Sequence, residues 1–405
     1  MPHPRSLSLS MRFGLMATLL LFVTAHVTRG DDPPGPQLLE ERTISPPEAG
    51  YAGWPTLTRL HSGELMVVWS GGRESHVCPF GQVLCMTSRD SGVTWTWPRV
   101  LLDSAIDDRD AGVLQTAQGT LLVTTFTSLA YVPTLHKARQ QANWDANRLA
   151  RWEAVHARLR DEQRTGDLGT WMIRSTDGGQ TWSTRYDSLV NSPHGPINLS
   201  DGRILYAGKQ LWSNEKQNGV AISNDDGATW QWLADIPTRP GDDPAQYHEL
   251  HAVETAPGHL IVQIRNHNPT NHLETLQCES TDGGRTWTEP HSIGVWGFPS
   301  HLLKLRDGRL LMSYGHRRAP RLQYGPHQCQ QRQVWFEPRQ ISSTAASTDL
   351  GYPSTVELDD GNLLTIWYEK LPDQPEPCAE CPAGNSRRNG SNPSALALDA
   401  PTITH

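Results

Sequence analysis

Short apolar runs that follow glycine turns recur along the chain and dominate its pattern of hydrophobic and polar positions. Each begins with a turn that has glycine at its second position, and the six copies occupy residues 62–69, 118–125, 201–206, 257–263, 307–313 and 360–367. A run that is apolar at consecutive positions is typical of a strand buried on both faces. With one such strand in each sheet, the repeat predicts six sheets.

A second repeat lies between these strands. The sequence S-x-D-x-G-x-T-W begins at Ser88, Ser175, Ser223 and Ser280. In a tight turn of this kind the aspartate accepts hydrogen bonds from nearby backbone amides, and the glycine permits a positive φ. We expect the threonine and tryptophan to begin the next strand, with the tryptophan packed between neighbouring sheets. The later copies start about 50 residues apart, which is the length of one four-stranded propeller blade.

Together the two repeats predict an all-β fold, a six-bladed β-propeller of antiparallel four-stranded blades spanning residues 31–372. The first interval between boxes is longer, and Trp144, Trp152 and Val155 lie within it near helical spacing. This spacing predicts a helical insertion between blades at about 134–166, which either covers a site or decorates the surface. Around residue 328, where a fifth box is expected, only the tryptophan remains, so we expect that blade to be the least regular.

The two ends of the chain differ from the repeats. Arg5 and Arg12 precede an apolar run of about 11 residues, shorter than the roughly 20 that cross a bilayer as a helix. This pattern predicts a signal peptide over residues 1–30 and a secreted or periplasmic protein, with a buried N-terminal strand as the alternative. Residues 373–405 are rich in Pro, Asn, Gly, Ser and Arg, and we expect a disordered tail there.

Composition narrows the possible partners. The chain contains 34 Gly and 30 Pro, which fits many turns between short strands and argues against a helical bundle. Its formal net charge of −8 gives no electrostatic reason to bind nucleic acid or an anionic membrane surface. Six cysteines permit disulfides in an exported protein, and for the pair Cys378 and Cys381 we favour a disulfide or free thiols over a metal site. We expect no metal, no cofactor and no membrane span.

The boxes, the six strands and the leader resemble the sialidase superfamily over roughly residues 48–370. In that family the boxes are structural and lie away from the active site, so they imply a fold and no activity. Sialidases hold the substrate carboxylate with three arginines and use an aspartate acid/base and a tyrosine nucleophile paired with a glutamate. A neutral tyrosine avoids the repulsion that a carboxylate nucleophile meets beside the substrate carboxylate.

Two segments match the family residue by residue. The sequence Gly351-Tyr-Pro-Ser-Thr-Val-Glu357 is similar to the last-blade segment that holds the nucleophile, which makes Tyr352 its candidate. The sequence Tyr247-His-Glu-Leu-His251 and the strand after it resemble the segment with the partner glutamate and the second arginine. These are Glu249 and Arg265, and a core tyrosine and a surface salt bridge are the structural alternatives.

Other positions depart from the family. Gly53-Trp54-Pro55 stands where the family has Arg-x-Pro, so Gly53 replaces the first arginine, and no aspartate follows in the stretch that should hold the acid/base. Glu74 and His76 are the local replacements, and Asp108 in the acidic cluster at 107–110 could supply an acid whose pKa is raised by its neighbours. Each of these side chains could equally belong to a turn or a salt bridge. The third arginine is sought among 317, 318 and 321, and we choose Arg318.

The remaining candidates are proposed to contact substrate. They are Arg73, Arg109, His248, His251 and Trp54. Histidines are unusually dense near these positions, and we favour hydrogen bonding to substrate over a metal site because no carboxylate–histidine spacing is clear.

These residues favour an exported, sialidase-like exo-glycoside hydrolase that acts on glycans and retains the anomeric configuration. Tyr352 would attack, Glu249 would accept its proton, and Arg265 with a second arginine would hold the carboxylate of sialic acid or a related acidic sugar. Two other classes stay open: a non-catalytic propeller that binds carbohydrate or protein, and a lyase or glycosidase that uses histidine as acid/base.

Overall fold

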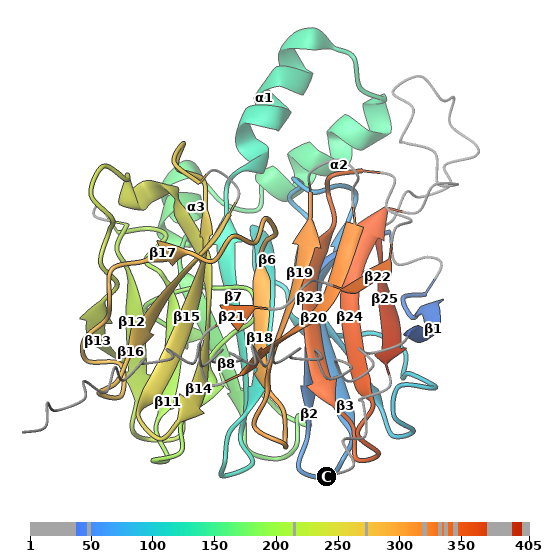
Figure 1. Ribbon diagram of the computed structural model, residues 1–405. Coiled ribbons are helices and arrows are strands. Elements are labelled where there is room, and N and C mark those ends of the chain that lie inside the picture. Colours follow the sequence, from blue (N-terminus) through green and yellow to red (C-terminus); the bar gives the residue numbers. More distant parts are fainter. Residues whose placement is uncertain are drawn as a thin grey trace, which may run out of the picture.

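The strands form six separate antiparallel sheets in a computed structural model that describes residues 38–46, 50–213, 216–271, 274–317, 322–330, 334–335, 339–342, 347–370 and 391–398 (Figure 1). Six hydrophobic clusters each join one sheet to the next, and the last joins the sixth sheet to the first. The sheets therefore close into a ring whose core lies between their faces. This is the all-β antiparallel propeller arrangement that the sequence predicts.

The first three sheets in chain order have four strands each. The first contains β2 (Tyr51–Arg59), β3 (Leu65–Arg73), β4 (Gln82–Ser88) and β5 (Arg99–Leu102). The second contains β6 (Asp107–Gln115), β7 (Leu121–Ser128), β8 (Thr170–Ser175) and β9 (Tyr186–Asp187). The third contains β10 (Ile197–Asn198), β11 (Ile204–Lys209), β12 (Asn218–Ser223) and β13 (Gln231–Asp235).

The next three sheets include the least regular one. The fourth follows the 3-10 turn η1 (Pro244–Gln246) and contains β14 (Tyr247–Ala256), β15 (His259–Asn266), β16 (Thr275–Ser280) and β17 (His291–Ser292). The fifth contains β18 (Ser300–Lys304), β19 (Leu310–His316), β20 (Leu322–Gln330), β21 (Val334–Trp335) and β22 (Arg339–Ser342). The sixth contains β23 (Gly351–Glu357), β24 (Leu363–Lys370), β25 (Ser391–Leu398) and β1 (Leu38–Thr43). The fifth sheet, which lacks a box, is the one with an additional strand, since β22 pairs with β20 beside β21.

The six apolar repeats become the second strand of each sheet, namely β3, β7, β11, β15, β19 and β24. Most of their residues are buried, as expected for strands covered on both faces. The first strand of each sheet precedes its repeat and lies nearest the ring axis, where β2 contacts both β6 and β23.

The four boxes adopt the predicted turn. In the first, Asp90 accepts hydrogen bonds from the Thr94 amide and hydroxyl, at 2.8 and 2.6 Å, and Gly92 has a φ of 87°. Trp95 packs against the cluster that joins the first and sixth sheets. The next strand, β5, begins only at Arg99, so this threonine and tryptophan close the turn and do not begin the strand.

The helical insertion is present, but its place differs from the prediction. Helices α1 (Tyr131–Gln141), α2 (Ala146–His156) and α3 (Asp161–Gly166) lie between β7 and β8, which are neighbours in one sheet. The insertion therefore interrupts a blade and does not separate two blades. The sequence could not show this, because the third strand of a blade carries no glycine signal of its own.

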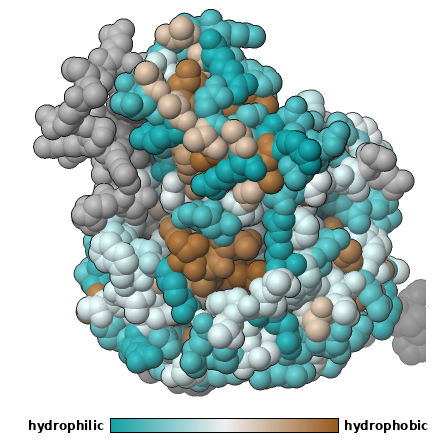
Figure 2. Space-filling view, turned by 180° about the vertical axis from the view of Figure 1, so that it is seen from behind, coloured by the Kyte–Doolittle hydropathy of each residue, from teal (hydrophilic) through white to brown (hydrophobic). Residues whose placement is uncertain are grey.

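The helices stand above one end of the strands (Figure 1). Seen from behind, hydrophobic residues gather in a patch below this helical layer, and mostly hydrophilic residues surround it (Figure 2). Among the described residues, no helix combines the length and the apolar character needed to cross a membrane.

The ends of the described chain meet in the sixth sheet. β25 pairs with β24 on one side and with β1 on the other, so strands from both ends of the chain complete this sheet. Residues 391–398, which fall in the predicted disordered tail, form the strand β25 between β24 and β1. The predicted signal segment 1–30 and the Cys378–Cys381 pair lie outside the described residues.

Candidate functional site

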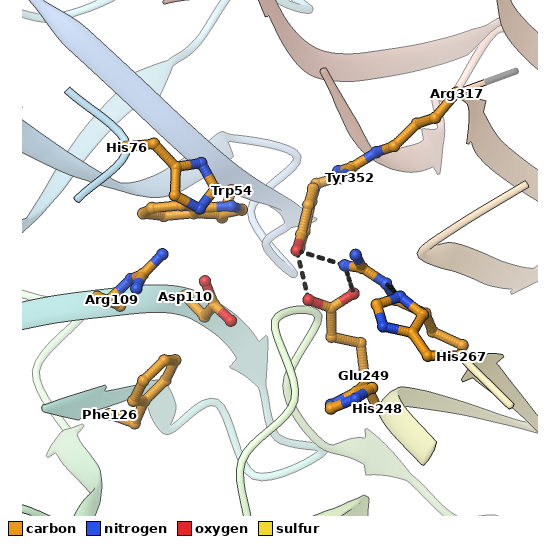
Figure 3. A pocket seen from close by; sticks show the side chains of 11 residues that line it. Trp54, His76, Arg109, Asp110, Phe126, His248, Glu249, His267, Arg317 and Tyr352 are labelled. Carbon is orange, nitrogen blue, oxygen red and sulfur yellow. Dashed lines mark hydrogen bonds and ion pairs between the residues drawn. The ribbon is translucent and has the colours of Figure 1, made fainter. Parts of the chain in front are cut away.

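A cavity of about 290 Å³ opens at the end of the ring that carries the helices, and eleven residues line it (Figure 3). The direction of the strands fixes this end. β2, β6, β14 and β23 all begin at the cavity, whereas each Asp box follows the third strand of its sheet, which runs away from it. The cavity and the boxes therefore lie at opposite ends of the ring.

Four cavity residues share an unusual backbone. Trp54, Asp110, Glu249 and Tyr352 have φ values of 56°, 49°, 41° and 52°, in the left-handed region that non-glycine residues rarely adopt. Each lies at a bulge where its strand loses register with the neighbouring strand. Bulges re-aim side chains, and left-handed residues cost about 1–3 kcal/mol each, so the surrounding fold must hold them. Equivalent strands of four blades thus direct a side chain into one cavity.

Tyr352, Glu249 and Arg265 form one hydrogen-bonded unit at the floor of the cavity. The Tyr352 hydroxyl donates a short hydrogen bond to Glu249 Oε1, and Arg265 Nη1 lies 2.6 Å from Glu249 Oε2 and 3.2 Å from the Tyr352 oxygen (Figure 3). These side chains come from β23, β14 and β15. The structure therefore brings together the three residues on which the predicted chemistry depends.

The charges of this unit are unequal. Burial alone would raise the pKa of Glu249, but the charge of Arg265 and the hydrogen bonds from Tyr352 and Arg265 lower it. Burial and the neighbouring Glu249 raise the pKa of Tyr352 well above its ordinary value. At neutral pH the resting site therefore holds a glutamate anion that accepts a hydrogen bond from a neutral tyrosine.

Asp110 faces this unit from β6 (Figure 3). Burial, reinforced by the charge of Glu249, raises the pKa of Asp110 to about 7. Its neighbour Arg109 also lines the cavity, with its guanidinium 4.7 Å from the Trp54 ring centre and 5.9 Å from that of Phe126. Asp110 can therefore hold a proton near neutral pH beside a permanent cation.

Trp54 forms an aromatic wall of the cavity, next to Gly53, the position where an arginine was expected. It packs with Tyr51, Tyr352 and Tyr368 in one buried cluster. The Arg73 guanidinium lies 4.9 Å from the Trp54 ring centre. Arg73 also forms a buried ion pair with Asp107, and the closest atoms of the two side chains are 2.5 Å apart. Arg73 does not line the cavity, so its predicted contact with substrate is replaced by a structural role.

His76 lines the cavity and is held from behind by a carboxylate. Its Nδ1 lies 3.0 Å from Asp349 Oδ1, and Tyr51 and Tyr368 also donate hydrogen bonds to Asp349. Burial alone would raise the pKa of Asp349, but its contacts with His76 and the tyrosines lower it to about 2. The anion fixes the position of the imidazole through Nδ1.

Two predicted acids lie outside the cavity lining. Glu74 accepts hydrogen bonds from Arg148, Arg151 and Trp152 of α2, so it anchors the helical insertion. Asp108 is fully buried, and its Oδ2 accepts a hydrogen bond from the Ser104 amide at 2.7 Å. The sequence singled out the right acidic cluster, but the bulge after Arg109 directs Asp110 into the cavity in place of Asp108.

The predicted substrate-binding residues divide in the same way. His248 lines the cavity, where burial lowers its pKa to about 4. His251 instead stacks on His301 in the interior, with ring centres 4.7 Å apart. Arg318 lies outside the described residues, whereas the adjacent Arg317 lines the cavity and donates a hydrogen bond to the Leu350 carbonyl at 2.8 Å.

Four residues of the lining are not among the site residues selected from the sequence, although His267 and Arg317 belong to the histidines and arginines that were considered: Asp110, Phe126, His267 and Arg317. His267 is held at 2.8 Å by the Arg265 Nε, and Arg317 and Asp110 are neighbours of residues that the sequence did select. Phe126 sits inside an apolar strand and carries no signal that separates it from core residues. Among the described residues, no group of histidine, cysteine and acidic side chains is arranged to hold a metal ion.

Comparison with known proteins gives a family and a fold. A family described as a BNR repeat-like domain matches residues 156–365, just over half of the chain. A sialidase of Paraclostridium sordellii is 24% identical over 262 residues, which cover 59% of this chain and 57% of the relative. A xyloglucanase of a Paenibacillus species is 28% identical over 199 residues, which cover 44% of this chain and 18% of the relative. The matches thus span less than two thirds of either relative.

Solved structures share the architecture. A protein of unknown function from Dyadobacter fermentans superposes with a TM-score of 0.71 at 22% identity, covering 91% of this chain and all of the other. A sialidase of Streptococcus pneumoniae superposes with a TM-score of 0.60 at 13% identity, covering 92% of this chain and 71% of the other. At these identities the likeness concerns the fold alone.

Proposed function

The chain belongs to the BNR repeat-like domain family of sialidase-like propellers, and from this membership we propose that it is an exo-glycoside hydrolase that releases a terminal acidic sugar from a glycan. The observation that carries the proposal is the hydrogen-bonded unit of Tyr352, Glu249 and Arg265 at the floor of a cavity. We count each sheet as one blade, so the site would occupy the axis of a six-bladed propeller.

The proposed first step is attack by the Tyr352 oxygen on the anomeric carbon. The tyrosine proton passes to the Glu249 carboxylate as the bond to the sugar forms. The glycosidic bond breaks at the same time, and the leaving oxygen takes a proton from His76, whose ring Asp349 holds in place through Nδ1. The product of this step is a glycosyl-tyrosine, a released aglycone and a neutral imidazole.

The proposed second step restores the enzyme. Water attacks the anomeric carbon from the side the aglycone has left and gives its proton to His76. The bond between this carbon and the Tyr352 oxygen breaks, and Glu249 returns a proton to that oxygen. Two inversions retain the anomeric configuration. Here histidine takes the place of the expected aspartate acid, so this proposal joins the sialidase interpretation to the histidine alternative.

The proposed substrate is acidic because three arginines, at positions 109, 265 and 317, line the cavity. A guanidinium binds a carboxylate through paired hydrogen bonds, and a water-depleted cavity strengthens that attraction. Gly53 in place of an arginine weakens the carboxylate clamp, so sialic acid and other acidic sugars, such as uronic acids, are all candidates. Protonated Asp110 would donate a hydrogen bond to a substrate hydroxyl.

The test is turnover of a panel of sialosides and uronic-acid glycosides, repeated with Tyr352→Phe. We expect wild-type hydrolysis of at least one acidic glycoside and a loss of about a thousandfold or more in the variant, with an unchanged melting temperature. Full turnover by Tyr352→Phe contradicts the tyrosine mechanism. Tight glycan binding without turnover of any substrate supports a carbohydrate-binding protein in its place, and unsaturated products indicate a lyase.

We also propose that residues 1–30 direct export and are removed. The expected result is a mature protein in the medium or periplasm whose first residue lies near position 31, measured by N-terminal sequencing. Recovery of the intact chain from the cytoplasm contradicts this proposal.

A further inference from the structure

A second cavity, of about 300 Å³, lies next to the first on the second and third sheets. We call it the Trp212 groove, and its lining includes Trp171, Asp187, Leu189, Gln210, Trp212 and Ser213. The residues come from β8, β9 and the segment that follows β11. Neither the sequence analysis nor the proposed chemistry uses any of them.

An aromatic contact joins the groove to the catalytic cavity. Phe126 lines the catalytic cavity, and its ring centre lies 6.4 Å from that of Trp212, with the rings tilted at 51°. A ligand that leaves the first cavity past Phe126 therefore meets Trp212 directly. The two cavities are therefore neighbours at this ring contact.

The groove presents aromatic surface that the fold does not use. Trp212 is 45% exposed, so much of its ring surface is open to a ligand. Trp171 is fixed from two sides, because its Nε1 donates to Thr127 Oγ1 at 3.0 Å and the Arg185 guanidinium lies 4.2 Å from its ring centre. A fixed and an exposed indole in one groove suit the apolar C–H face of a sugar ring.

The charges of the groove differ from those of the catalytic cavity. Its lining has one charged side chain, Asp187, where the catalytic cavity has three arginines. The nearby cation of Arg185 is already paired with Asp167. The Thr170 hydroxyl and the Leu189 amide both bind Asp187 through Oδ1, at 3.1 and 2.8 Å, which orients its carboxylate. Such a lining accepts hydrogen bonds from hydroxyl groups and disfavours an anionic ligand.

We propose that the Trp212 groove binds a neutral sugar ring of the glycan, the residue next to the acidic sugar that the catalytic cavity holds. Trp212 would stack on this ring and Asp187 would accept a hydrogen bond from one of its hydroxyls. The assignment rests on the proposed function for the identity of the neighbouring sugar. The binding of a neutral saccharide in the groove does not depend on turnover.

The first experiment measures binding without catalysis. Full-length Tyr352→Phe protein is mixed with lactose or cellobiose, and saturation-transfer NMR detects contact with the sugar protons. We expect a signal that Trp212→Ala abolishes and that Trp97→Ala keeps, because Trp97 is 74% exposed but lines neither cavity. Asp187→Asn, a substitution of similar size, is expected to weaken the signal. An equal signal from the Trp212→Ala protein overturns the proposal.

The second experiment measures what the groove contributes to turnover. The kcat/KM for an acidic sugar linked to lactose is compared with that for its glycosyl fluoride, whose leaving group is a single atom too small to reach the groove. We expect Trp212→Ala to lower the first value about tenfold and to change the second less than twofold. Equal losses on both substrates contradict a leaving-group subsite. If wild-type protein turns over neither substrate the proposed function fails, and the binding experiment alone decides the groove.

Discussion

The two ends of the propeller use aspartate in opposite ways. At the box end, Asp90, Asp225 and Asp282 accept hydrogen bonds from threonines four residues later, and all three have lowered pKa values. At the cavity end, burial raises the pKa of Asp108 to about 8 and that of Asp110 to about 7. These turn aspartates are thus ionised at neutral pH, whereas the buried Asp108 and Asp110 hold a proton near neutral pH.

The two groups of aspartates differ in where their interacting residues lie along the chain. The hydrogen-bond partners of a box aspartate belong to its own turn, so a few residues determine its state. The neighbours of Asp110 come from other sheets, and the charge that most raises its pKa after burial belongs to Glu249. The box end is therefore a local structure that repeats, and the cavity end exists only after the sheets have closed into a ring.

The largest effect on kcat is expected from a substitution at one end of strand β14, and the same substitution near its other end is the control. Glu249 at its start contacts Tyr352, whereas Glu254 near its end accepts a hydrogen bond from the Ser200 amide at 2.6 Å. Glu249→Gln is expected to lower kcat by about 10² to 10⁴, because the glutamine cannot take the tyrosine proton. Steady-state kinetics on the best acidic glycoside measures this. Glu254→Gln is the matched control, with kcat within about twofold of wild type.

The second prediction concerns the sign of the pH dependence. The raised pKa of Asp108 stabilises the fold fully below its unfolded value of 3.8, and this contribution is lost as the pH rises through about 8. Asp108→Asn, which cannot ionise, is therefore expected to raise the melting temperature at pH 8 by several degrees and to change it little at pH 4. Thermal melts at both values measure the difference.

The box end supplies the opposite sign as a control for that experiment. Hydrogen bonds from Thr94 lower the pKa of Asp90 to about 2, so its stabilising effect is present above pH 3.8 and is lost as the pH falls through 2. Asp90→Asn should therefore lower the melting temperature at pH 8 more than at pH 2. If both substitutions changed the melting temperature at pH 8 in the same direction, this would contradict the difference between the two groups of aspartates.

A smaller loss is expected when one box is broken outright. Asp225 accepts hydrogen bonds from the Thr229 amide and hydroxyl at 2.9 and 2.6 Å. Asp225→Ala removes both and is expected to cost about 1–2 kcal/mol, which lowers the melting temperature by about 2–4 °C. Calorimetry measures the shift, and kcat for the same glycoside should stay unchanged. A fall in kcat at 25 °C would show that the box end affects the chemistry.

The smallest effect belongs to the junction between the mouth and the helical insertion. Glu74→Gln weakens the ion pairs with Arg148 and Arg151 of α2, and such partly exposed pairs contribute up to about 1 kcal/mol. Hydrogen exchange in α2 should accelerate by up to about fivefold, as measured by mass spectrometry. Box peptides are the internal reference, and unchanged exchange in α2 would contradict the anchoring role of Glu74.

The sequence predicted the repeating parts because their physics is local. Each box contains its own acceptor, donors and glycine, and each apolar run identifies the second strand of a sheet. It also led to Tyr352, Glu249 and Arg265, through a resemblance in two short segments. It did not show that Asp108 and Arg73 lie outside the cavity lining. The direction of a residue at a bulge and the burial of an ion pair depend on strands that are distant in the sequence.

Sequence alone therefore determined an antiparallel propeller built from four boxes and six apolar strands. Only the tertiary structure decided that Asp110 lies in the cavity, that Asp349 holds His76, and that the Trp212 ring lies next to that of Phe126. These arrangements depend on contacts between blades and on left-handed residues such as Tyr352 that the closed ring keeps in place. Contacts between blades have no fixed spacing along the chain, so no sequence pattern records them.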